Sequence, residues 1–445
     1  GGDVRLNMAS PAFPDHMADQ TPCTASEAST DDAERAEAIT PAAFYAAAAA
    51  SALGFGGGRR TVATAVAANK LVCSKDYYSP LTGHLLPHLH LVHEALRPGR
   101  GGRRRPAVWL AGDSSFDNKA WVPHDWSAAR NGYENALAGP MQEDVCFHVN
   151  AELQAQGHGG PEGHFCVNAA VEMSLLYARG CGLYAQDEFL RDHLEEQDTL
   201  LVSVGGNDIA LQPLLATLAN VGALALTPEA CLRPERTCAC PLDCPVDADH
   251  ATCGTAACLR TGLAGWPLGL GYIVDLFRNK VERYVRRLVG KTRPRKVLVC
   301  MIYYLDEVAC TPYGWADPAL CCLGYNWAPG RLQQMIRTVF ELATKKIRVP
   351  GVAVVAFPLF EVLDGKTSSD YHSRVEPSSA GGRKMARALV KCAMAPLQPA
   401  PRQPPAPHLQ PWVETPRSLK VPTPPEPREM ERENAQDDGD TDPTC

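Results

Sequence analysis

The chain has 445 residues, of which 45% are hydrophobic and 21% are charged, as in an ordinary globular protein. Its formal net charge of -7 argues against a nucleic-acid-binding protein, which normally presents a basic face. No apolar run reaches the roughly 18 residues that a membrane-spanning helix needs, so we expect no integral membrane segment.

Both ends of the chain have the composition of disordered segments. Residues 1–40 are polar and rich in Pro, Thr and acidic residues, and residues 396–445 are first Pro-rich and then acidic. Such segments bury too little apolar surface to offset the entropy lost on ordering, so we expect both to be disordered. The chain does not begin with Met, and the sequence therefore leaves targeting open.

Residues 41–105 predict a helical N-terminal extension. Its most apolar run, residues 42–55, is mostly alanine, which favours a helix, with a cleaved targeting segment as the alternative. The basic run at residues 100–105 is short and precedes an apolar run, so it is interpreted as a solvated loop before the first strand.

From residue 106 to about residue 395 the pattern alternates between strand and helix. Short continuous apolar runs, typical of strands that are covered on both faces, occur at residues 107–111, 164–167, 199–204, 296–302 and 352–357. Apolar residues recur at helical spacing over residues 273–288 and 332–347, and a last helix is expected over residues 379–393. This alternation predicts an α/β fold, a three-layer α/β/α domain with a flavodoxin-like sheet of five parallel strands.

An insert at about residues 228–262 is rich in cysteine. Six of the 17 cysteines fall within it, namely Cys231, Cys238, Cys240, Cys244, Cys253 and Cys258. Their spacing contains no Cys-x-x-Cys pair, so disulfides are favoured over a zinc site. We expect a disulfide-stapled subdomain over one side of the site, and such an insert is compatible with a secretory or organellar compartment.

Two short polar blocks follow predicted strands. The first, Gly-Asp-Ser-Ser-Phe-Asp-Asn at residues 112–118, places Ser114 on a strand-to-helix turn, which exposes and aims a hydroxyl as a nucleophile requires. A serine that caps a helix is the structural alternative. The second, Gly-Gly-Asn-Asp at residues 205–208, offers the side-chain amide of Asn207 to an oxyanion, and an ordinary turn is its alternative.

These blocks stand in order with Val-Asn-Ala-Ala-Val at residues 167–171 and Asp-Tyr-His at residues 370–372. Together, over residues 106–393, they resemble the SGNH (GDSL) hydrolase family, and residues 300–307 resemble SGNH-like proteins of algae and protists. The resemblance implies that Ser114 is the nucleophile and that its own backbone N–H, with Gly206 and Asn207, binds the oxyanion. The family takes a third donor from a glycine after the second strand. This chain has none there, so Ala170 or Met173 is expected to supply that N–H.

The catalytic base is the part of the pattern that departs from the family. The family motif Asp-x-x-His-Pro falls on residues 373–377, where Ser373 replaces the aspartate and Glu376 replaces the histidine. Asp370 and His372 lie a few residues earlier, so we expect His372 to be the base and Asp370 to orient it. Glu376 is the alternative acid or base, and His124 is a less favoured candidate.

The sequence therefore predicts a serine-dependent ester hydrolase of the esterase or lipase type that forms an acyl-enzyme on Ser114. The expected substrate is a small-molecule or lipid ester, and neither a metal nor an organic cofactor is required. An acyltransferase that uses the same serine is one alternative. A non-catalytic binding protein on the same scaffold is the other, because the His-Pro pair is missing.

Overall fold

The computed structural model describes residues 71–210, 220–224, 226–237, 265–309 and 316–397. The disorder predicted for residues 1–40 and for nearly all of residues 396–445 lies outside these ranges. Five of the six cysteines in the predicted insert also lie outside them. The following description concerns the described residues alone.

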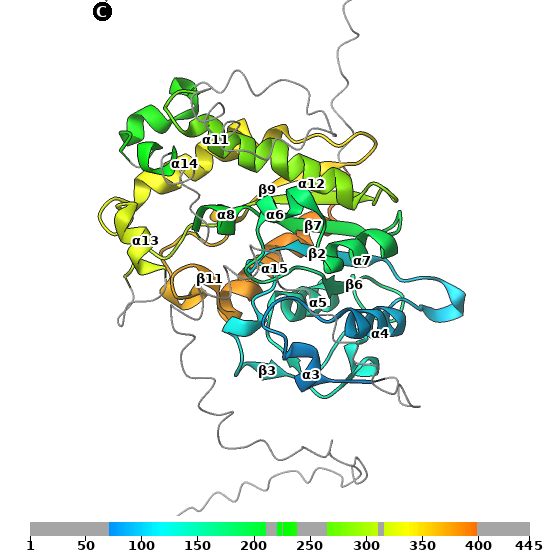
Figure 1. Ribbon diagram of the computed structural model, residues 1–445. Coiled ribbons are helices and arrows are strands. Elements are labelled where there is room, and N and C mark those ends of the chain that lie inside the picture. The colour runs from blue at the N-terminus through cyan, green and yellow to red at the C-terminus, as the bar shows by residue number, and fades with distance from the viewer. Residues whose placement is uncertain (1–70, 211–219, 225, 238–264, 310–315, 398–445) are drawn as a thin grey trace, which may run out of the picture. The chain divides into compact units, whose positions relative to one another are not determined.

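A sheet of five parallel strands forms the centre of the molecule (Figure 1). In chain order the strands are β2 (Ala107–Gly112), β6 (Phe165–Asn168), β7 (Thr199–Ser203), β8 (Lys296–Met301) and β9 (Val354–Pro358). They are arranged β6-β2-β7-β8-β9, and every neighbouring pair is parallel. This confirms the predicted five-stranded parallel sheet and its flavodoxin-like order.

Helices connect these strands and cover them. They are α3 (Ser74–Tyr78), α4 (Leu86–Leu96), α5 (Val145–Ala155), α6 (Leu176–Cys181), α7 (Ala185–His193), α8 (Gly206–Ala210), α11 (Leu270–Asp275), the π-helical segment η7 (Leu276–Lys280), α12 (Val281–Leu288), α13 (Asp317–Cys322), α14 (Pro329–Leu342) and α15 (Ser379–Met394). Short strands pair outside the main sheet: β1 (Val72–Cys73) with β4 (Leu137–Ala138), β3 (Trp126–Ser127) with β5 (Met141–Gln142), and β10 (Tyr371–His372) with β11 (Glu376–Pro377).

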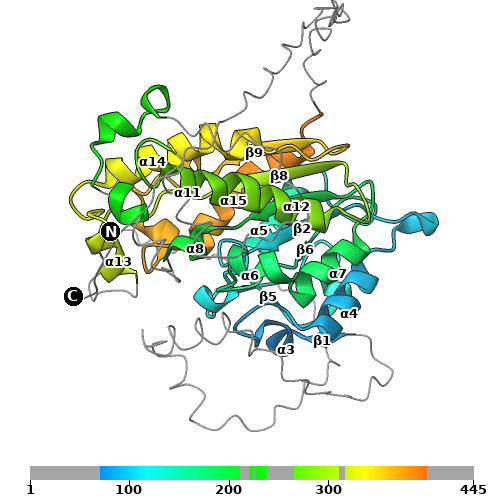
Figure 2. The same ribbon diagram turned by 45° about the horizontal axis from the view of Figure 1, so that its top comes forward.

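The helices contact one another in separate groups. Helix α15 packs along α5, whereas α12 contacts α6 and α7, and α7 also contacts α4. Helices α11 and α14 contact each other, and α13 lies beside them in both views (Figures 1 and 2). The three-layer stacking of these helices on the sheet stays a prediction.

Residues before the first sheet strand share the core of the sheet domain. Tyr77 and Leu89 are buried in the same hydrophobic cluster as the central strands. Arg97, directly after α4, forms a buried ion pair with Asp198, with Nη1 and Oδ1 2.8 Å apart. Asp198 also accepts hydrogen bonds from the Ala107 backbone N–H and the Trp109 indole, so one carboxylate joins α4 to the start of β2. A buried pair with this many hydrogen bonds fixes the position of α4.

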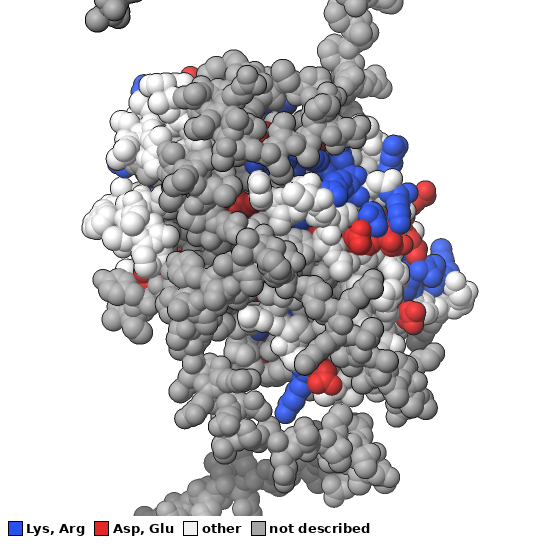
Figure 3. Space-filling view, in the orientation of Figure 1, with Lys and Arg blue, Asp and Glu red and all other residues white. Residues whose placement is uncertain are grey.

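The surface of the described residues carries charges of both signs. Lys291 forms an ion pair with Asp192 at 2.7 Å, and Arg191 pairs with the same carboxylate. Figure 3 shows Lys, Arg, Asp and Glu side chains intermixed over the coloured part of one face. Within the described ranges, no helix is both long enough and apolar enough to cross a membrane.

The cysteines of the described residues form no disulfide. No disulfide joins any of these nine cysteines, which include Cys231, the one member of the predicted insert that is described. The expectation of a disulfide-stapled insert therefore has no support in the structure. The described thiols lie in several environments, and Cys166 and Cys300 are buried in strands of the main sheet, where cysteine serves as a small apolar side chain.

Candidate active site

The turn that carries Ser114 begins at the end of β2, where only glycine fits. Gly112 has φ +142°, and a Cβ there would lie 1.8 Å from the carbonyl oxygen of Ser203 on the neighbouring strand. The Gly112 carbonyl accepts a hydrogen bond from buried Arg179, whose Nε in turn donates to Asp187. The chain therefore leaves the sheet in a fixed direction, and Ser114 lies in the turn that follows, 6% exposed.

The two serines of the turn have different roles. The Ser115 hydroxyl lies 2.7 Å from both Asp113 Oδ1 and the Ser203 hydroxyl, so it is held within the turn. Burial raises the pKa of Asp113 to about 6, although its hydrogen bonds with Ser115 oppose this shift. Ser114 makes no such bond within the turn, and its hydroxyl reaches across to a different part of the chain.

That distant partner is Glu376 in β11. Ser114 Oγ donates to Glu376 Oε1 at 3.3 Å. Burial raises the pKa of Glu376 to about 8, the hydrogen bond from Ser114 lowers it, and the negative charge of Asp113 adds to the rise. The other carboxylate oxygen, Oε2, is buried without a hydrogen-bond partner in the described structure. A long hydrogen bond of this kind is common in ligand-free sites and shortens when the substrate binds.

Neighbouring hydrogen bonds fix the backbone around Glu376. The Tyr303 hydroxyl donates to the carbonyl oxygen of Val375 at 2.6 Å, and Asn118 Nδ2 donates to that of Pro377 at 3.0 Å. Asn118 belongs to the same sequence block as Ser114. The residues that present the serine therefore also position the carboxyl group that faces it.

A second buried glutamate, Glu172, lies near Glu376. Burial raises its pKa well above the usual range, and the charge of Glu376 contributes to the rise. The Trp121 indole donates to Glu172 Oε1 at 3.0 Å, while Oε2 is buried without a partner among the described residues. Glu172 was not predicted from the sequence, although an acidic residue four positions after the end of a buried strand was a visible signal.

The structure places Asp370 and His372 differently from the expected pair. Asp370 is buried and accepts from Lys384 Nζ at 2.6 Å, at the N-terminal part of α15. His372 is exposed on β10, directly opposite Glu376 in the register of the two short strands. Among the described residues the His372 side chain shares no hydrogen bond with Asp370 or Ser114. Burial of part of the ring lowers the pKa of His372.

Candidate oxyanion donors gather around Ser114. Asn207 Nδ2 donates one hydrogen to the Ser174 carbonyl oxygen at 3.1 Å, which leaves the second hydrogen of the same amide for a ligand. Among the described residues the backbone N–H groups of Ser114 and Met173 donate no hydrogen bond. Met173 has φ +57°, the left-handed conformation that glycine adopts most easily. The Ala170 N–H, by contrast, donates to Asn168 Oδ1 at 3.0 Å and is already engaged.

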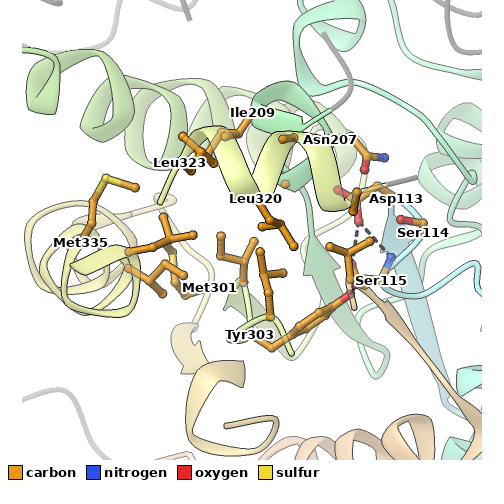
Figure 4. A pocket seen from close by; sticks show the side chains of 18 of the residues that line it. Asp113, Ser114, Ser115, Asn207, Ile209, Met301, Tyr303, Leu320, Leu323 and Met335 are labelled. Carbon is orange, nitrogen blue, oxygen red and sulfur yellow. Dashed lines mark hydrogen bonds between the residues drawn. The ribbon is translucent and has the colours of Figure 1, made fainter. Parts of the chain in front are cut away.

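A cavity of about 130 Å³ opens at Ser114. Ser114, Gly206, Asn207 and Glu376 line one end of it. Figure 4 shows Asp113, Ser114 and Ser115 at that end, and the side chains of Leu323 and Met335 toward the other. A serine hydroxyl, a carboxyl group in contact with it and the amide of Asn207 thus line a common space. This set of groups suits acyl transfer from an ester to water.

No cluster of three or more His, Cys, Asp or Glu side chains in the described ranges has the geometry to hold a metal ion. Asp208, the last residue of the second block, has a structural role: its carboxylate accepts from the backbone N–H groups of Leu176 and Tyr177, both at 2.8 Å. This caps the first turn of α6 and holds α8 beside it.

No family model matches the chain, and no curated protein matches it. Several solved structures do. Axe2, an acetylxylan esterase from Geobacillus stearothermophilus, is 15% identical with a TM-score of 0.34, over 68% of this chain and 100% of that one. An extracellular lipase from Streptomyces rimosus is 12% identical with a TM-score of 0.29, over 65% of this chain and 99% of that one. Est24, a carbohydrate acetylesterase from Sinorhizobium meliloti, is 11% identical with a TM-score of 0.29, over 64% of this chain and 97% of that one.

These structures are described as two esterases and a lipase. The identities and TM-scores are low, so the neighbours define neither the substrate nor the catalytic residues of this chain.

Proposed function

We propose that this protein is a serine-dependent ester hydrolase in which Ser114 is the nucleophile and Glu376 is the general base. The observation that carries the proposal is the hydrogen bond from Ser114 Oγ to Glu376 Oε1, 3.3 Å long, at the end of a cavity. The sequence favoured His372 as the base, with Glu376 as the alternative. The positions of the two side chains favour Glu376.

Acylation needs one proton to move twice. The Glu376 carboxylate takes the proton of Ser114 as Oγ bonds to the ester carbonyl carbon, and the carbonyl oxygen becomes an oxyanion. When the intermediate collapses, the bond to the alcohol oxygen breaks and Glu376 returns the proton to that oxygen. Water then attacks the acyl-enzyme in the same way, its proton passing through Glu376 to Ser114 as the acid is released.

The oxyanion would be bound by N–H groups near Ser114. The backbone N–H of Ser114, the second hydrogen of Asn207 Nδ2 and the N–H of Met173 are the three proposed donors, with Gly206 allowing close approach. Removal of one such donor typically costs ~10²–10³ in kcat. We propose Met173 in place of Ala170, since the Ala170 N–H is already bonded to Asn168.

A second candidate function is binding without hydrolysis. The observation in its favour is the pKa of about 8 that burial gives Glu376, because a carboxyl group that keeps its proton at neutral pH cannot accept one from Ser114. The same cavity would then hold a ligand that is never cleaved. Reaction of Ser114 with an active-site-directed reagent separates the two candidates.

The test is ester hydrolysis by four variants, measured as kcat/KM on a p-nitrophenyl ester at pH 8. We expect Ser114→Ala and Glu376→Gln each to lower kcat/KM by ~10³-fold or more, since residues that act as a unit give similar losses. His372→Ala and the control Glu361→Gln, an exposed carboxyl, should retain near-full activity. Full activity in Glu376→Gln together with loss in His372→Ala would restore the pair first expected from the sequence.

For the fold, we propose the three-layer SGNH arrangement. Its support is that the helices pack in separate groups, with α5 against α15 and with α12 against α6 and α7.

A further inference from the structure

The cavity that opens at Ser114 changes character along its length. At the Ser114 end it is lined by hydroxyl, carboxyl and amide side chains. Beyond these, apart from the Tyr303 hydroxyl, which is bonded to Val375, every lining side chain is a hydrocarbon or a thioether. Figure 4 shows this division, with Leu320 and Met301 between the polar end and Met335.

The apolar part of the cavity has no group that recognises a sugar or a charge. A hydroxyl-rich or ionic group placed there would lose its hydrogen bonds with water and gain none from the walls, which is unfavourable. A hydrocarbon chain makes no hydrogen bonds with water and therefore loses none on entering the cavity. The lining therefore selects an apolar occupant, and the polar end accepts one functional group.

The walls of the cavity are built from several elements that are held in place. Helix α14 contributes Met335 and Ile336, η7 contributes Phe277, and α13 contributes Ala319 and Leu320. All of them line the cavity directly, so the space is enclosed on more than one side by packed helices.

Helix α13 is short and needs anchors to act as a wall. Its first residue, Asp317, forms a buried ion pair with Arg374 at 2.8 Å. Beyond its end, the Tyr325 hydroxyl donates to the Leu305 carbonyl oxygen at 2.6 Å. Tyr325 and Leu320 also form a small apolar cluster with Met173, the residue proposed as an oxyanion donor. The cavity wall and the catalytic end are therefore parts of one packed unit.

From this geometry we propose that the cavity is an acyl-chain site, and that the substrate class is esters of extended aliphatic acids rather than acetyl esters. The proposal rests on the proposed function for the reaction, but the binding it describes does not require hydrolysis. The ester carbonyl would lie between Ser114 and Asn207, with the acyl chain extending along Leu320 toward Met335. The alcohol would leave from the opposite side, outside the apolar lining.

The experiment measures kcat/KM for p-nitrophenyl esters from acetate to palmitate. A chain that enters an apolar cavity should gain about fourfold per methylene until the cavity is filled, and then level off. In Ala319→Trp the indole would occupy part of the cavity, and the ratio of dodecanoate to acetate kcat/KM should fall at least tenfold. In Met335→Ala the far end is enlarged, and the plateau should move to longer chains.

The matched control is Cys322→Trp, which adds the same ring to the exposed side of α13 and should leave the chain-length profile unchanged. Thermal denaturation of each variant checks that it is folded. If Ala319→Trp does not fold, Met335→Ala still tests whether the cavity sets the chain-length profile. A wild-type profile that is flat or highest for acetate would overturn the proposal. So would a profile that neither substitution alters.

Binding to Ser114→Ala separates this proposal from the proposed function. Calorimetric titration of Ser114→Ala with dodecanoate, and with acetate as the comparison, reports the cavity without any turnover. Tight dodecanoate binding that Ala319→Trp weakens, in a protein that hydrolyses no ester, would support the acyl-chain site and reject the hydrolase. Failure of dodecanoate to bind would reject the acyl-chain site whether or not the protein hydrolyses esters.

Discussion

A serine hydroxyl attacks an ester only when a neighbouring group takes its proton. At the residue scale the group we propose is the carboxyl of Glu376, buried and bonded to Ser114, where the SGNH pattern has a histidine. A carboxylate of ordinary pKa is a weak base at neutral pH. Burial raises the pKa of Glu376 to about 8 and so brings its basicity close to that of an imidazole or above it.

The second carboxyl group supplies a prediction at this scale. Burial raises the pKa of Glu172 well above its ordinary value, and the charge of Glu376 raises it further. The rise of the Glu376 pKa, in contrast, comes from burial and from the charge of Asp113. Glu172→Gln keeps the shape of the side chain, so in a pH profile of kcat/KM the rise that marks deprotonation of Glu376 should stay in place.

The matched control for that measurement is Glu361→Gln, which removes an exposed carboxyl and should leave the profile in place. A rise that moves to lower pH in Glu172→Gln would contradict this and show that an ionised Glu172 raises the pKa of Glu376.

At the scale of elements, the site depends on how β2 ends. Gly112→Ala would force a methyl group against the Ser203 carbonyl oxygen and impose a left-handed φ on alanine. We expect the free energy of unfolding to fall by about 2–4 kcal/mol, from overpacking and backbone strain together. Urea denaturation measures it, with Gly180→Ala in α6, where a Cβ meets no atom within 4 Å, as the control. Equal stability of the two variants would contradict the role assigned to Gly112.

The elements of the sheet were also the part that the sequence predicted best. Each strand is a continuous apolar run bounded by polar residues, and burial on both faces leaves no other stable arrangement for such a run. The strand at residues 107–111 and the last helix were placed to within a residue or two. The blocks at Ser114 and Asn207 follow strands directly, so their place at the carboxyl edge also followed from the sequence.

The base and the cavity were harder to predict, for a physical reason. Both depend on contacts between residues far apart in the chain, such as Ser114 and Glu376, which are separated by 262 positions. Two short antiparallel strands, at residues 371–372 and 376–377, pair His372 with Glu376, and of these two only Glu376 is buried. Directly opposite residues lie on the same face of such a pair, so the difference in burial depends on what packs against each side chain, and no spacing in the sequence reveals that.

At the scale of the whole molecule, buried ionisable groups predict how stability depends on pH. Burial raises the pKa of Asp144 to about 7 and that of Glu376 to about 8, above their ordinary values, so the folded state holds these protons more tightly than the unfolded chain. Their contribution to stability is complete at low pH and is lost as pH rises toward 8. Burial lowers the pKa of His84 and His93 to about 3, and their contribution is lost as pH falls below 6.5.

The melting temperature should therefore be highest near pH 5–6 and fall on both sides. A group that is protonated in only one of the folded and unfolded states changes the free energy of unfolding by at most about 1.4 kcal/mol per pH unit. Calorimetry between pH 3 and pH 9 measures this curve, and Glu376→Gln should flatten its alkaline side. A melting temperature that keeps rising from pH 6 to pH 8 would show that these carboxyl groups are not held protonated in the folded state.

Activation of Ser114 by Glu376 can be tested through the rate at which a fluorophosphonate labels the serine at different pH values. The rate should increase with pH through an apparent pKa of about 8, as Glu376 loses its proton. Labelling should be absent in Ser114→Ala, reduced by ~10³-fold in Glu376→Gln, and unchanged in His372→Ala. Labelling of Glu376→Gln at the wild-type rate, or no labelling of the wild-type protein at any pH, would contradict it.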